Sequence, residues 1–303
     1  MATDQAAGVL DAQIAESLRP KRPLYVTVWN LTRQNPLGVF GLLVVAGLVI
    51  VAVFAPFIAP HDVGTLQTSP EVKADPSWSN LFGTDHLGRD MFSRVVFGAR
   101  ISLMVGFLAV GGGTAIALVL GIISGYAGGA IDNVIQRAVD TAIAFPGLLL
   151  LLILAQVLGP SVQTVILAVG IFIIFPVTRV VRGAVLSERN NQYVEAARAI
   201  GASTPRILFQ HIAPNIVALA IIIATTLLGT AILAEAALSF LGLGIPVPNP
   251  SWGTDVAEAR NHLPLHIWWA FFPGAAITLT VLAFNLLGDS LRDVFDPRLR
   301  GRL

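Results

Sequence analysis

The side chains that most often carry chemistry in proteins are sparse in this sequence. It contains five histidines and no cysteine, so thiolate ligands, disulfides and cysteine nucleophiles are excluded. His262 and His266 are spaced i, i+4, a separation that can put two metal ligands on one helical face. No glutamate of the HExxH pattern lies between them, and Pro264 interrupts the helix. The pair therefore favours a loop ahead of an apolar segment, with a metal site as the alternative.

Nucleotide chemistry has no visible site in the chain. The phosphate-binding loop of an ATPase ends in a lysine followed by serine or threonine. The chain has only two lysines, Lys21 and Lys73, and neither follows a glycine-rich turn. A Gly-x-Ser-x-Gly elbow is absent as well, which counts against a membrane hydrolase. If the chain takes part in an ATP-driven process, we expect a partner to bind the ATP.

The most informative polar segment covers residues 182–215. Good helix formers run through 193–200, and Glu195 in the first turn interacts favourably with the helix dipole. Gly201 can end this helix in a left-handed turn. The segment therefore predicts a short helix with a sharp turn after it.

A second helix is predicted directly after this turn. Ser203 or Thr204 can cap it, and Pro205 suits its first position. Pro214 then breaks it next to a long apolar segment. The product is a helical hairpin, which is suited to transmit motion from a partner; a plain connecting loop is the alternative.

Long apolar segments must position this hairpin. Of all residues, 55% are apolar and 12% are charged, about half the charge of a soluble domain. A membrane-spanning helix needs about 20 mostly apolar residues, and six segments meet this need. A turn at Gly159-Pro160 separates the third from the fourth. The predicted spans are residues 37–59, 101–124, 136–158, 163–181, 216–240 and 266–288.

The predicted fold class is an all-α membrane protein with six transmembrane helices. A tail over 1–36 precedes the first transmembrane helix and its outer loop, 37–99. A five-helix core over 100–290 contains the 182–215 loop, and a second tail covers 291–303.

The basic residues predict the orientation, because they favour the cytoplasmic side of a membrane. With six spans, 14 basic residues fall on the side that holds both termini and the 182–215 loop, and 5 fall on the other side. Both termini and the hairpin are therefore predicted to be cytoplasmic.

Small residues and prolines predict how the spans pack. A stripe of small side chains allows another helix to approach closely, either within the chain or between subunits. Its members recur every four residues and are Ala109, Gly113, Ala117, Gly121, Gly125 and Gly129. Pro146 and Pro176 are predicted to kink the third and fourth spans.

Two acidic residues lie in or beside the predicted spans. Asp140 and Glu235 lie near span ends, where water can reach them. Arg137, one turn before Asp140, is its expected partner, and Glu235 is expected to have a structural or outer-gate role. Buried acid–base pairs of the kind that proton-driven carriers use are not found in the sequence.

The hairpin sequence is similar to a known motif. Glu195-Ala196-Ala197, with Gly201 and the more distant Pro214, resembles the EAA motif of binding-protein-dependent ABC importer permeases. Three further segments resemble the peptide/nickel-type members of this family, and in particular the C-type subunit of their heterodimers. They are residues 83–103, 234–253 and 285–300.

This resemblance implies a type I ABC importer permease architecture, in which the hairpin is a coupling helix that sits in a cleft of an ATPase subunit. The residues to which it assigns coupling are Glu195, Ala196, Ala197, Arg198, Gly201, Arg206 and Pro214. The implied partners are a second homologous permease subunit in a heterodimer, two ATP-binding subunits, an extracytoplasmic solute-binding protein and the lipid bilayer, with no nucleic acid. ATP would bind to the partner subunits, no cofactor is expected in this chain, and the implied location is the cytoplasmic (inner) membrane of a bacterium.

The resemblance also limits the cargo to dipeptides, oligopeptides or related small solutes such as glutathione or nickel chelates. Polar residues of the spans are the candidates for the substrate pathway, namely Gln156, Gln163, Thr226 and Glu235. A passive channel or secondary carrier is the alternative, and it would need charged groups at mid-membrane. A membrane enzyme is a further alternative, for which no catalytic set is visible.

Overall fold

Helices form nearly all regular structure in the residues that the computed structural model describes, which are 35–61, 63, 72–263 and 265–295. No β-strand occurs within these residues; one isolated bridge joins Thr84 and Asp90. The prediction of an all-α chain is therefore confirmed. The predicted tails lie largely outside the described residues.

Among the residues that the structure describes, five helices are long and apolar enough to cross a membrane. Each contains most or all of one predicted span, namely the first, second, fourth, fifth and sixth. They are α3 (Pro36–Val53), α5 (Met91–Ala127), α8 (Val162–Glu188), α11 (Ala213–Phe240) and α13 (Trp268–Phe295).

The third predicted span is not one continuous helix. Its residues belong to α6 (Gly129–Ile143) and α7 (Gly147–Leu158), whose axes differ by 91°. Pro146 causes the break, because the residue before a proline is disfavoured in a helix and Pro146 itself has extended ψ of 125°. The predicted kink is thus a complete break, and the pair counts as a sixth span only if the two helices are taken together.

The remaining helices are short and lie at the two ends of the bundle. They are α4 (Ala55–Ile58), α9 (Gln192–Ala199), α10 (Thr204–Ile207), the π-helix η1 (Leu208–Ile212), α12 (Trp252–Ala259) and the 3-10 helix η2 (Arg260–His262). The end that carries α9 and α10 is called the hairpin end below. The opposite end, with α12 and the loop 72–90, is called the α12 end.

The prediction that Pro214 breaks the second hairpin helix is wrong. The helical path continues from α10 through η1 into α11, and Pro214 lies in the first turn of α11. In η1 the N–H of Ala213 bonds to the carbonyl of Leu208, five residues back. This wider turn and the position of Pro214 at a helix start accommodate a residue that has no N–H to donate.

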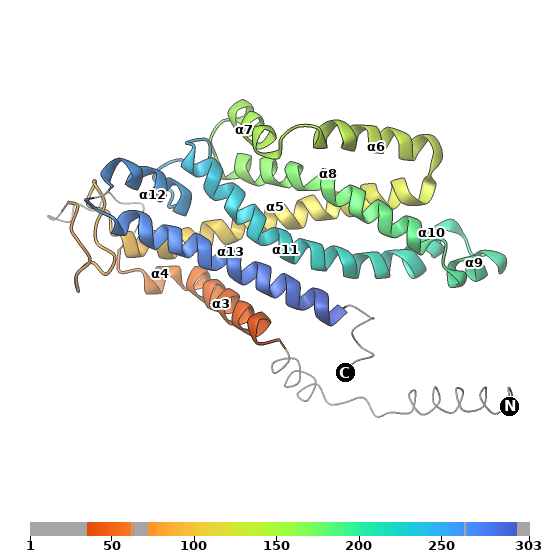
Figure 1. The fold of residues 1–303 in the computed structure, drawn as a ribbon, viewed down its shortest axis with the longest axis horizontal. Coiled ribbons are helices and arrows are strands. Elements are labelled where there is room, and N and C mark those ends of the chain that lie inside the picture. The colour runs from red at the N-terminus through yellow and green to blue at the C-terminus, as the bar shows by residue number, and fades with distance from the viewer. Residues whose placement is uncertain (1–34, 62, 64–71, 264, 296–303) are drawn as a thin grey trace, which may run out of the picture.

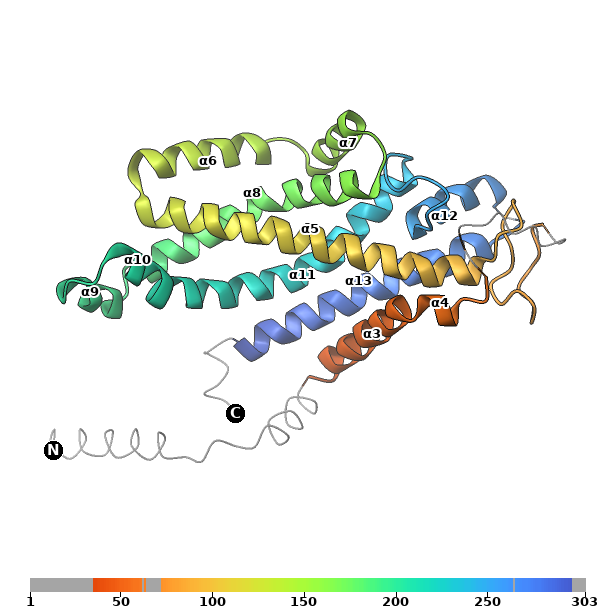
Figure 2. The same ribbon diagram turned by 180° about the vertical axis from the view of Figure 1, so that it is seen from behind.

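The long helices lie side by side along the axis of the molecule. In Figure 1, α3, α13, α11 and α8 follow one another across the front, and α6 and α7 lie along the far side of α8. Figure 2 shows the reverse side, where α5 runs the length of the bundle. α5 packs most extensively against α8, and α11 packs against both α5 and α13.

The small-residue stripe lies inside the chain, between α5 and α8. A Cβ atom on Gly113 would lie 2.7 Å from the carbonyl oxygen of Gly170, and one on Gly121 would lie 2.5 Å from Val181 Cγ1. The stripe therefore serves close helix packing within the subunit. Gly129 is the exception, because it starts α6 with a φ of 55° and meets no neighbour.

Candidate functional site

The 182–215 segment forms the predicted hairpin, and it projects from the bundle (Figure 1). Gly201 has a φ of 80°, and its N–H bonds to Arg198 O at 2.9 Å. The N–H of Ala202 reaches back to Ala197 O at 3.0 Å, which completes a left-handed helix end. Ser203 occupies the cap position of α10, although its side chain makes no capping hydrogen bond.

One face of the hairpin is anchored and the other is exposed. Val194, Ala197 and Ile207 are buried against the bundle. Glu195 and its neighbours on the opposite face are exposed, and Ile200 at the tip is 86% exposed. The exposed members of the predicted coupling set are Glu195, Ala196, Arg198, Gly201, Arg206 and Pro214, while Ala197 is buried.

The base of the hairpin is held by hydrogen bonds centred on Glu188, the last residue of α8. Its carboxylate accepts hydrogen bonds from the phenol of Tyr193 and from Asn215 Nδ2, the latter at 2.6 Å. Tyr193 also stacks on His211, with ring centroids 6.2 Å apart. Partial burial and the bond to Glu188 raise the pKa of Tyr193, so its phenol stays protonated and donating. α8, α9 and α11 are thereby joined at one point.

The two arginines of the predicted coupling set have contacts within the chain. Arg198 places its guanidinium carbon 5.8 Å from the ring centre of Tyr126, at the end of α5. Arg206 donates to the side-chain oxygen of Gln210 at 3.0 Å. Sequence reasoning found neither contact. The Arg198 contact depends on how the hairpin turns back on the bundle, whereas Arg206 and Gln210 are only four residues apart.

Two ion pairs join α6 to α8 near the hairpin end. Arg182 binds Asp132 through two hydrogen bonds of 2.5 Å. Arg179 pairs with Asp140, so the expected pairing of Asp140 with Arg137 is wrong. The reason is tertiary: α6 lies along α8, which brings together residues 39 positions apart.

Glu235 lies inside the protein near the α12 end of α11. It is fully buried, so the expectation that water reaches it is wrong. Its carboxylate accepts hydrogen bonds from Ser102 of α5 at 2.9 Å, Ser239 at 2.9 Å and Ser251 at 2.8 Å. Glu235 therefore joins α5, α11 and the start of α12, which fits the expected structural role.

A buried ion pair fixes α12 to α5, and the sequence analysis did not find it. Arg94 Nε and Nη2 donate to Asp255 Oδ1 at 2.8 and 2.5 Å, and both side chains are 1% exposed. Trp252 Nε1 donates to Val95 O at 2.9 Å beside this pair. The expected lack of buried acid–base pairs is thus wrong at the α12 end of α5. The two partners are 161 residues apart, and although Arg94 lies in the family-like segment 83–103, nothing in that segment indicates Asp255 as its partner.

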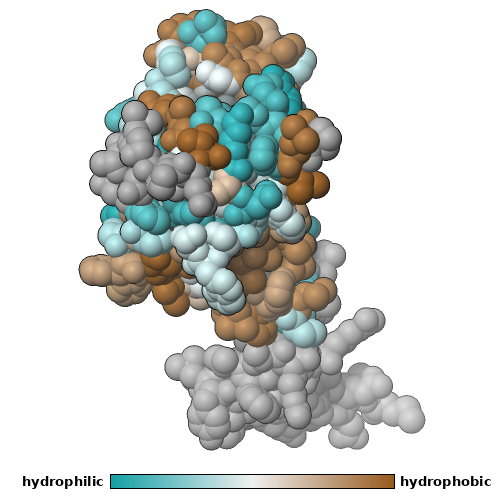
Figure 3. Space-filling model, turned by 90° about the vertical axis from the view of Figure 1, so that its left-hand side faces the viewer, coloured by the Kyte–Doolittle hydropathy of each residue, from teal (hydrophilic) through white to brown (hydrophobic). Residues whose placement is uncertain are grey.

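Charged and aromatic side chains gather around this pair at the α12 end. Arg89 binds Asp85 and, at 2.6 Å, Glu258 of α12. Figure 3 looks onto this end and shows hydrophilic side chains bordered by hydrophobic ones. The predicted loop character of 262–266 agrees with η2 ending at His262, and Pro264 lies outside the described residues.

The histidines of this end do not form the considered metal pair. His262 packs against Trp269 edge to face at 4.8 Å, and His266 stacks on the same ring at 5.1 Å. Among the described residues, potential ligand atoms converge at Asp85, His86 and Glu258, but Arg89 already pairs with both acids. Partial burial and neighbouring basic groups lower the pKa of His262.

The four candidates for a substrate pathway lie on α7, α8 and α11. Gln156 is exposed near the end of α7, and Gln163 is exposed in the first turn of α8. Thr226 is exposed at the middle of α11, whereas Glu235 is buried. Their assignment to a substrate pathway stays a prediction.

Two family models match the chain. The model of the binding-protein-dependent transport system inner membrane component matches residues 117–301. The model of the N-terminal transmembrane domain of oligopeptide transport permease C matches residues 24–76. Together they cover the hairpin, α3 and the core helices from the last part of α5 onward.

Characterised relatives match most of the chain. The dipeptide transport system permease protein DppC of Alkalihalophilus pseudofirmus is 41% identical over 268 residues, which cover 88% of this chain and 88% of that protein. The glutathione transport system permease protein GsiD of Escherichia coli O6:K15:H31 is 44% identical over 273 residues, 90% of each chain. The same glutathione permease of Shigella boydii is equally similar. The chain therefore belongs to the family of binding-protein-dependent transport system inner membrane components, and it is a non-catalytic, multi-pass permease subunit of the peptide branch of ABC importers.

Proposed function

We propose that this chain is the C-type half of a permease heterodimer that imports short peptides, or related solutes such as glutathione, across the cytoplasmic membrane of a bacterium. Two ATP-binding subunits drive the complex, and an extracytoplasmic solute-binding protein delivers the cargo. The named cargoes of the relatives support the solute class. The basic residues support the orientation, because 14 of 19 fall on the side of the hairpin in a six-span topology.

The observation that carries the coupling role is the construction of the hairpin. It exposes Glu195, Arg198 and Ile200 on a rigid support, and Glu188 ties that support to α8 and α11. The exposed surface thus combines charged groups with a large apolar side chain, a composition that a protein partner can cover. ATP binding closes the ATPase subunits, moves the hairpin, and favours one of two packed arrangements of the spans.

Reconstitution of both permease subunits with the two ATP-binding subunits and the solute-binding protein in proteoliposomes tests this role. Uptake of a radiolabelled dipeptide and ATP hydrolysis are measured in the same vesicles. We expect Glu195→Ala and Ile200→Asp to lower uptake per ATP hydrolysed by at least about tenfold, equivalent to 1.4 kcal/mol of coupling. Both residues are exposed, so the substitutions remove no packing within the chain.

The matched control is Asp293→Asn, an exposed acid on α13 away from the hairpin, which should behave like the wild type. Normal coupling in both hairpin variants would refute the docking role. Uptake that proceeds without ATP would instead favour the channel or carrier alternative.

At the α12 end we propose that the polar surface receives the solute-binding protein. α12 is suited to this task because Arg94 and Trp252 fix it to α5, and Glu235 fixes its start to α11. A partner that binds there would contact an element that moves together with the spans.

A further inference from the structure

The loop that precedes α5 displays one tryptophan almost completely to solvent. Trp78 is 98% exposed, more than any other large apolar side chain in the described part of the chain. Its two neighbours, Ser77 and Ser79, are exposed polar residues. Aromatic side chains contribute much of the binding energy of protein interfaces because they bury a large area. A partner that covers Trp78 therefore gains the burial of a whole indole ring.

Trp78 lies in a turn whose backbone is fixed by hydrogen bonds. The N–H of Ser77 donates to Asn80 O at 2.9 Å, and the N–H of Asn80 donates to Ser77 Oγ at 3.2 Å. The carbonyl of Asn80 also accepts from the N–H of Gly83 at 2.9 Å, and Asn80 itself is buried. The turn thus holds the backbone of the tryptophan in place before a partner arrives, which lowers the entropy cost of binding.

The base of this turn is joined to three helices. Phe82 stacks on Phe272 of α13 with ring centroids 3.8 Å apart, and it meets Phe92 of α5 edge to face at 5.1 Å. Arg89 connects the loop to α12, because its guanidinium binds Glu258 at 2.6 Å. A partner that binds the turn is thereby connected to α5, α12 and α13.

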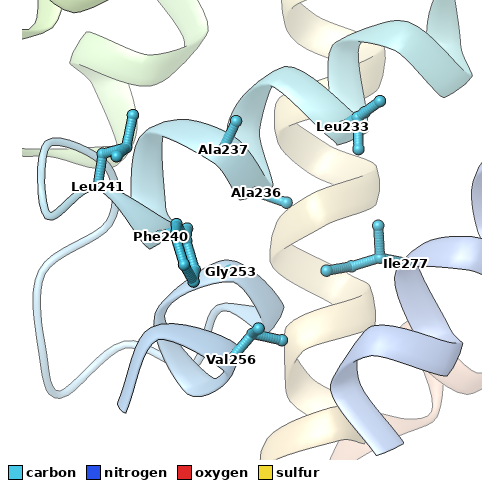
Figure 4. A pocket seen from close by; sticks show the side chains of 8 residues that line it. All are labelled: Leu233, Ala236, Ala237, Phe240, Leu241, Gly253, Val256 and Ile277. Atoms are coloured by element: carbon cyan, nitrogen blue, oxygen red, sulfur yellow. The ribbon is translucent and has the colours of Figure 1, made fainter. Parts of the chain in front are cut away.

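α12 extends this connection to α11. A Cβ atom on Gly253 would lie 2.2 Å from the carbonyl oxygen of Ala236, so the two helices touch closely. Beside this contact is an apolar pocket of about 280 Å³, which Figure 4 shows between α11, α12 and α13. Its lining includes Leu233 of α11, Val256 of α12 and Ile277 of α13. Any displacement of α12 therefore changes a space between two spans.

The base of the turn lies outside the bilayer. Arg100 is exposed directly before the second predicted span, 101–124. α5 begins nine residues earlier, at Met91, and nine residues of helix extend about 14 Å. The headgroup layer on one side of a bilayer is only about 5–8 Å thick. Because the N–H of Met91 donates to Gly83 O at 3.1 Å, the base of the turn is level with the start of α5.

We infer that Trp78 is the anchor that holds the extracytoplasmic solute-binding protein on this permease. Its indole enters an apolar pocket of that protein, and the exposed Lys73 and Asp75 beside the turn belong to the polar rim of the contact. The solute-binding protein is the partner that fits, because the turn lies in water and is joined to α12, where that protein is proposed to bind. This inference rests on the proposed function, since it names the residue that holds one of its partners.

Stimulation of ATP hydrolysis by the solute-binding protein measures this contact. The full complex is placed in lipid nanodiscs, and the solute-binding protein of the same importer, loaded with Ala-Phe, is titrated. We expect Trp78→Ala to raise the concentration for half-maximal stimulation at least about thirtyfold, as truncation of an interface hot spot does. Trp78→Phe should recover part of this loss. At saturation Trp78→Ala should reach the wild-type rate, which separates weaker docking from misfolding.

The matched control is Phe57→Ala on α4. Phe57 is an aromatic residue of the same end and is 86% exposed, but it lies inside the first predicted span, 37–59, where we expect lipid around it. Its removal should leave the concentration for half-maximal stimulation as in the wild type. Equal concentrations for the wild type and Trp78→Ala would refute the anchor.

A fluorescent label at the same position identifies the occupant. Trp78→Cys gives this chain a single thiol, which is labelled with bimane in a complex whose other subunits lack cysteine. We expect emission typical of water, no quenching by spin-labelled lipids, and a blue shift when the solute-binding protein is added. Quenching by the lipids would refute the proposal and assign Trp78 to the membrane surface. A label already shielded without the solute-binding protein would refute it in favour of the second permease.

Failure of the proposed function gives a different result. In that case the unmodified complex shows no ATP-dependent uptake of Ala-Phe and no response to the solute-binding protein. If the unmodified complex transports the dipeptide and Trp78→Ala responds to the solute-binding protein as the wild type does, the function stands and only the anchor is wrong.

Discussion

Breaking the Arg94–Asp255 ion pair tests whether α12 is a fixed part of the bundle. The pair is almost completely buried, and it joins α12 to α5 through hydrogen bonds of 2.8 and 2.5 Å. Arg94→Gln leaves the carboxylate of Asp255 buried without a cation, a change that destabilises proteins by about 3–5 kcal/mol. We expect the apparent melting temperature of the purified complex to fall on the order of 5–10 °C, measured by fluorescence-detected size exclusion after heating.

A double variant separates the buried charge from the rest of the contact. Arg94→Met with Asp255→Leu removes both charges and keeps most of the volume, so we expect it to recover most of the lost stability. Arg179→Gln is the control, because the Arg179–Asp140 pair is about half exposed on both sides. Exposed pairs contribute at most about 1 kcal/mol.

Two results would refute this reasoning. If Arg94→Gln and Arg179→Gln lowered the melting temperature equally, the first pair would not be buried in the working complex. The second result concerns the fall in melting temperature of the double variant. If this fall equalled the sum of the falls in Arg94→Met and Asp255→Leu measured separately, the two side chains would act independently, and α12 would not be held by their interaction.

Two glycine substitutions extend these predictions. Gly121→Ala should lower the melting temperature, because its Cβ would overlap Val181, whereas Gly112→Ala on the same helix meets no neighbour and should be neutral or slightly stabilising. Gly201→Ala meets no neighbour but has a φ of 80°, which costs an alanine about 1–2 kcal/mol locally. We expect it to lower uptake per ATP in vesicles while the helical Gly183→Ala does not, and equal coupling in the two would contradict a need for the left-handed turn.

The spans and the hairpin could be predicted because their signals are local. An uncharged apolar run predicts a membrane helix wherever it packs, and the left-handed Gly201 needs only its own backbone. Pro214 and Pro146 were harder to interpret, since both are helix breakers in isolation. The π-helix before Pro214 accommodates it, whereas no such turn precedes Pro146 and the helix ends there.

The polar contacts between distant helices could not be predicted, because they join residues far apart in the sequence. Arg94 and Asp255 lie 161 positions apart, and Ser102 and Glu235 lie 133 apart. Without the fold, Arg94 is one basic residue among 19 and predicts only a side of the membrane. Asp140 shows the same limit, since its nearest basic residue in sequence is not its partner.

α11 connects the two polar anchors of the molecule. At its start, Asn215 binds Glu188 beside the hairpin, and near its end Glu235 binds Ser251 at the start of α12. Its 28 residues correspond to about 42 Å of unbroken helix. If ATP moves the hairpin as proposed, α11 transfers that displacement to α12 as a rigid rod. The bent pair α6 and α7 cannot do so, because its 91° break interrupts the path.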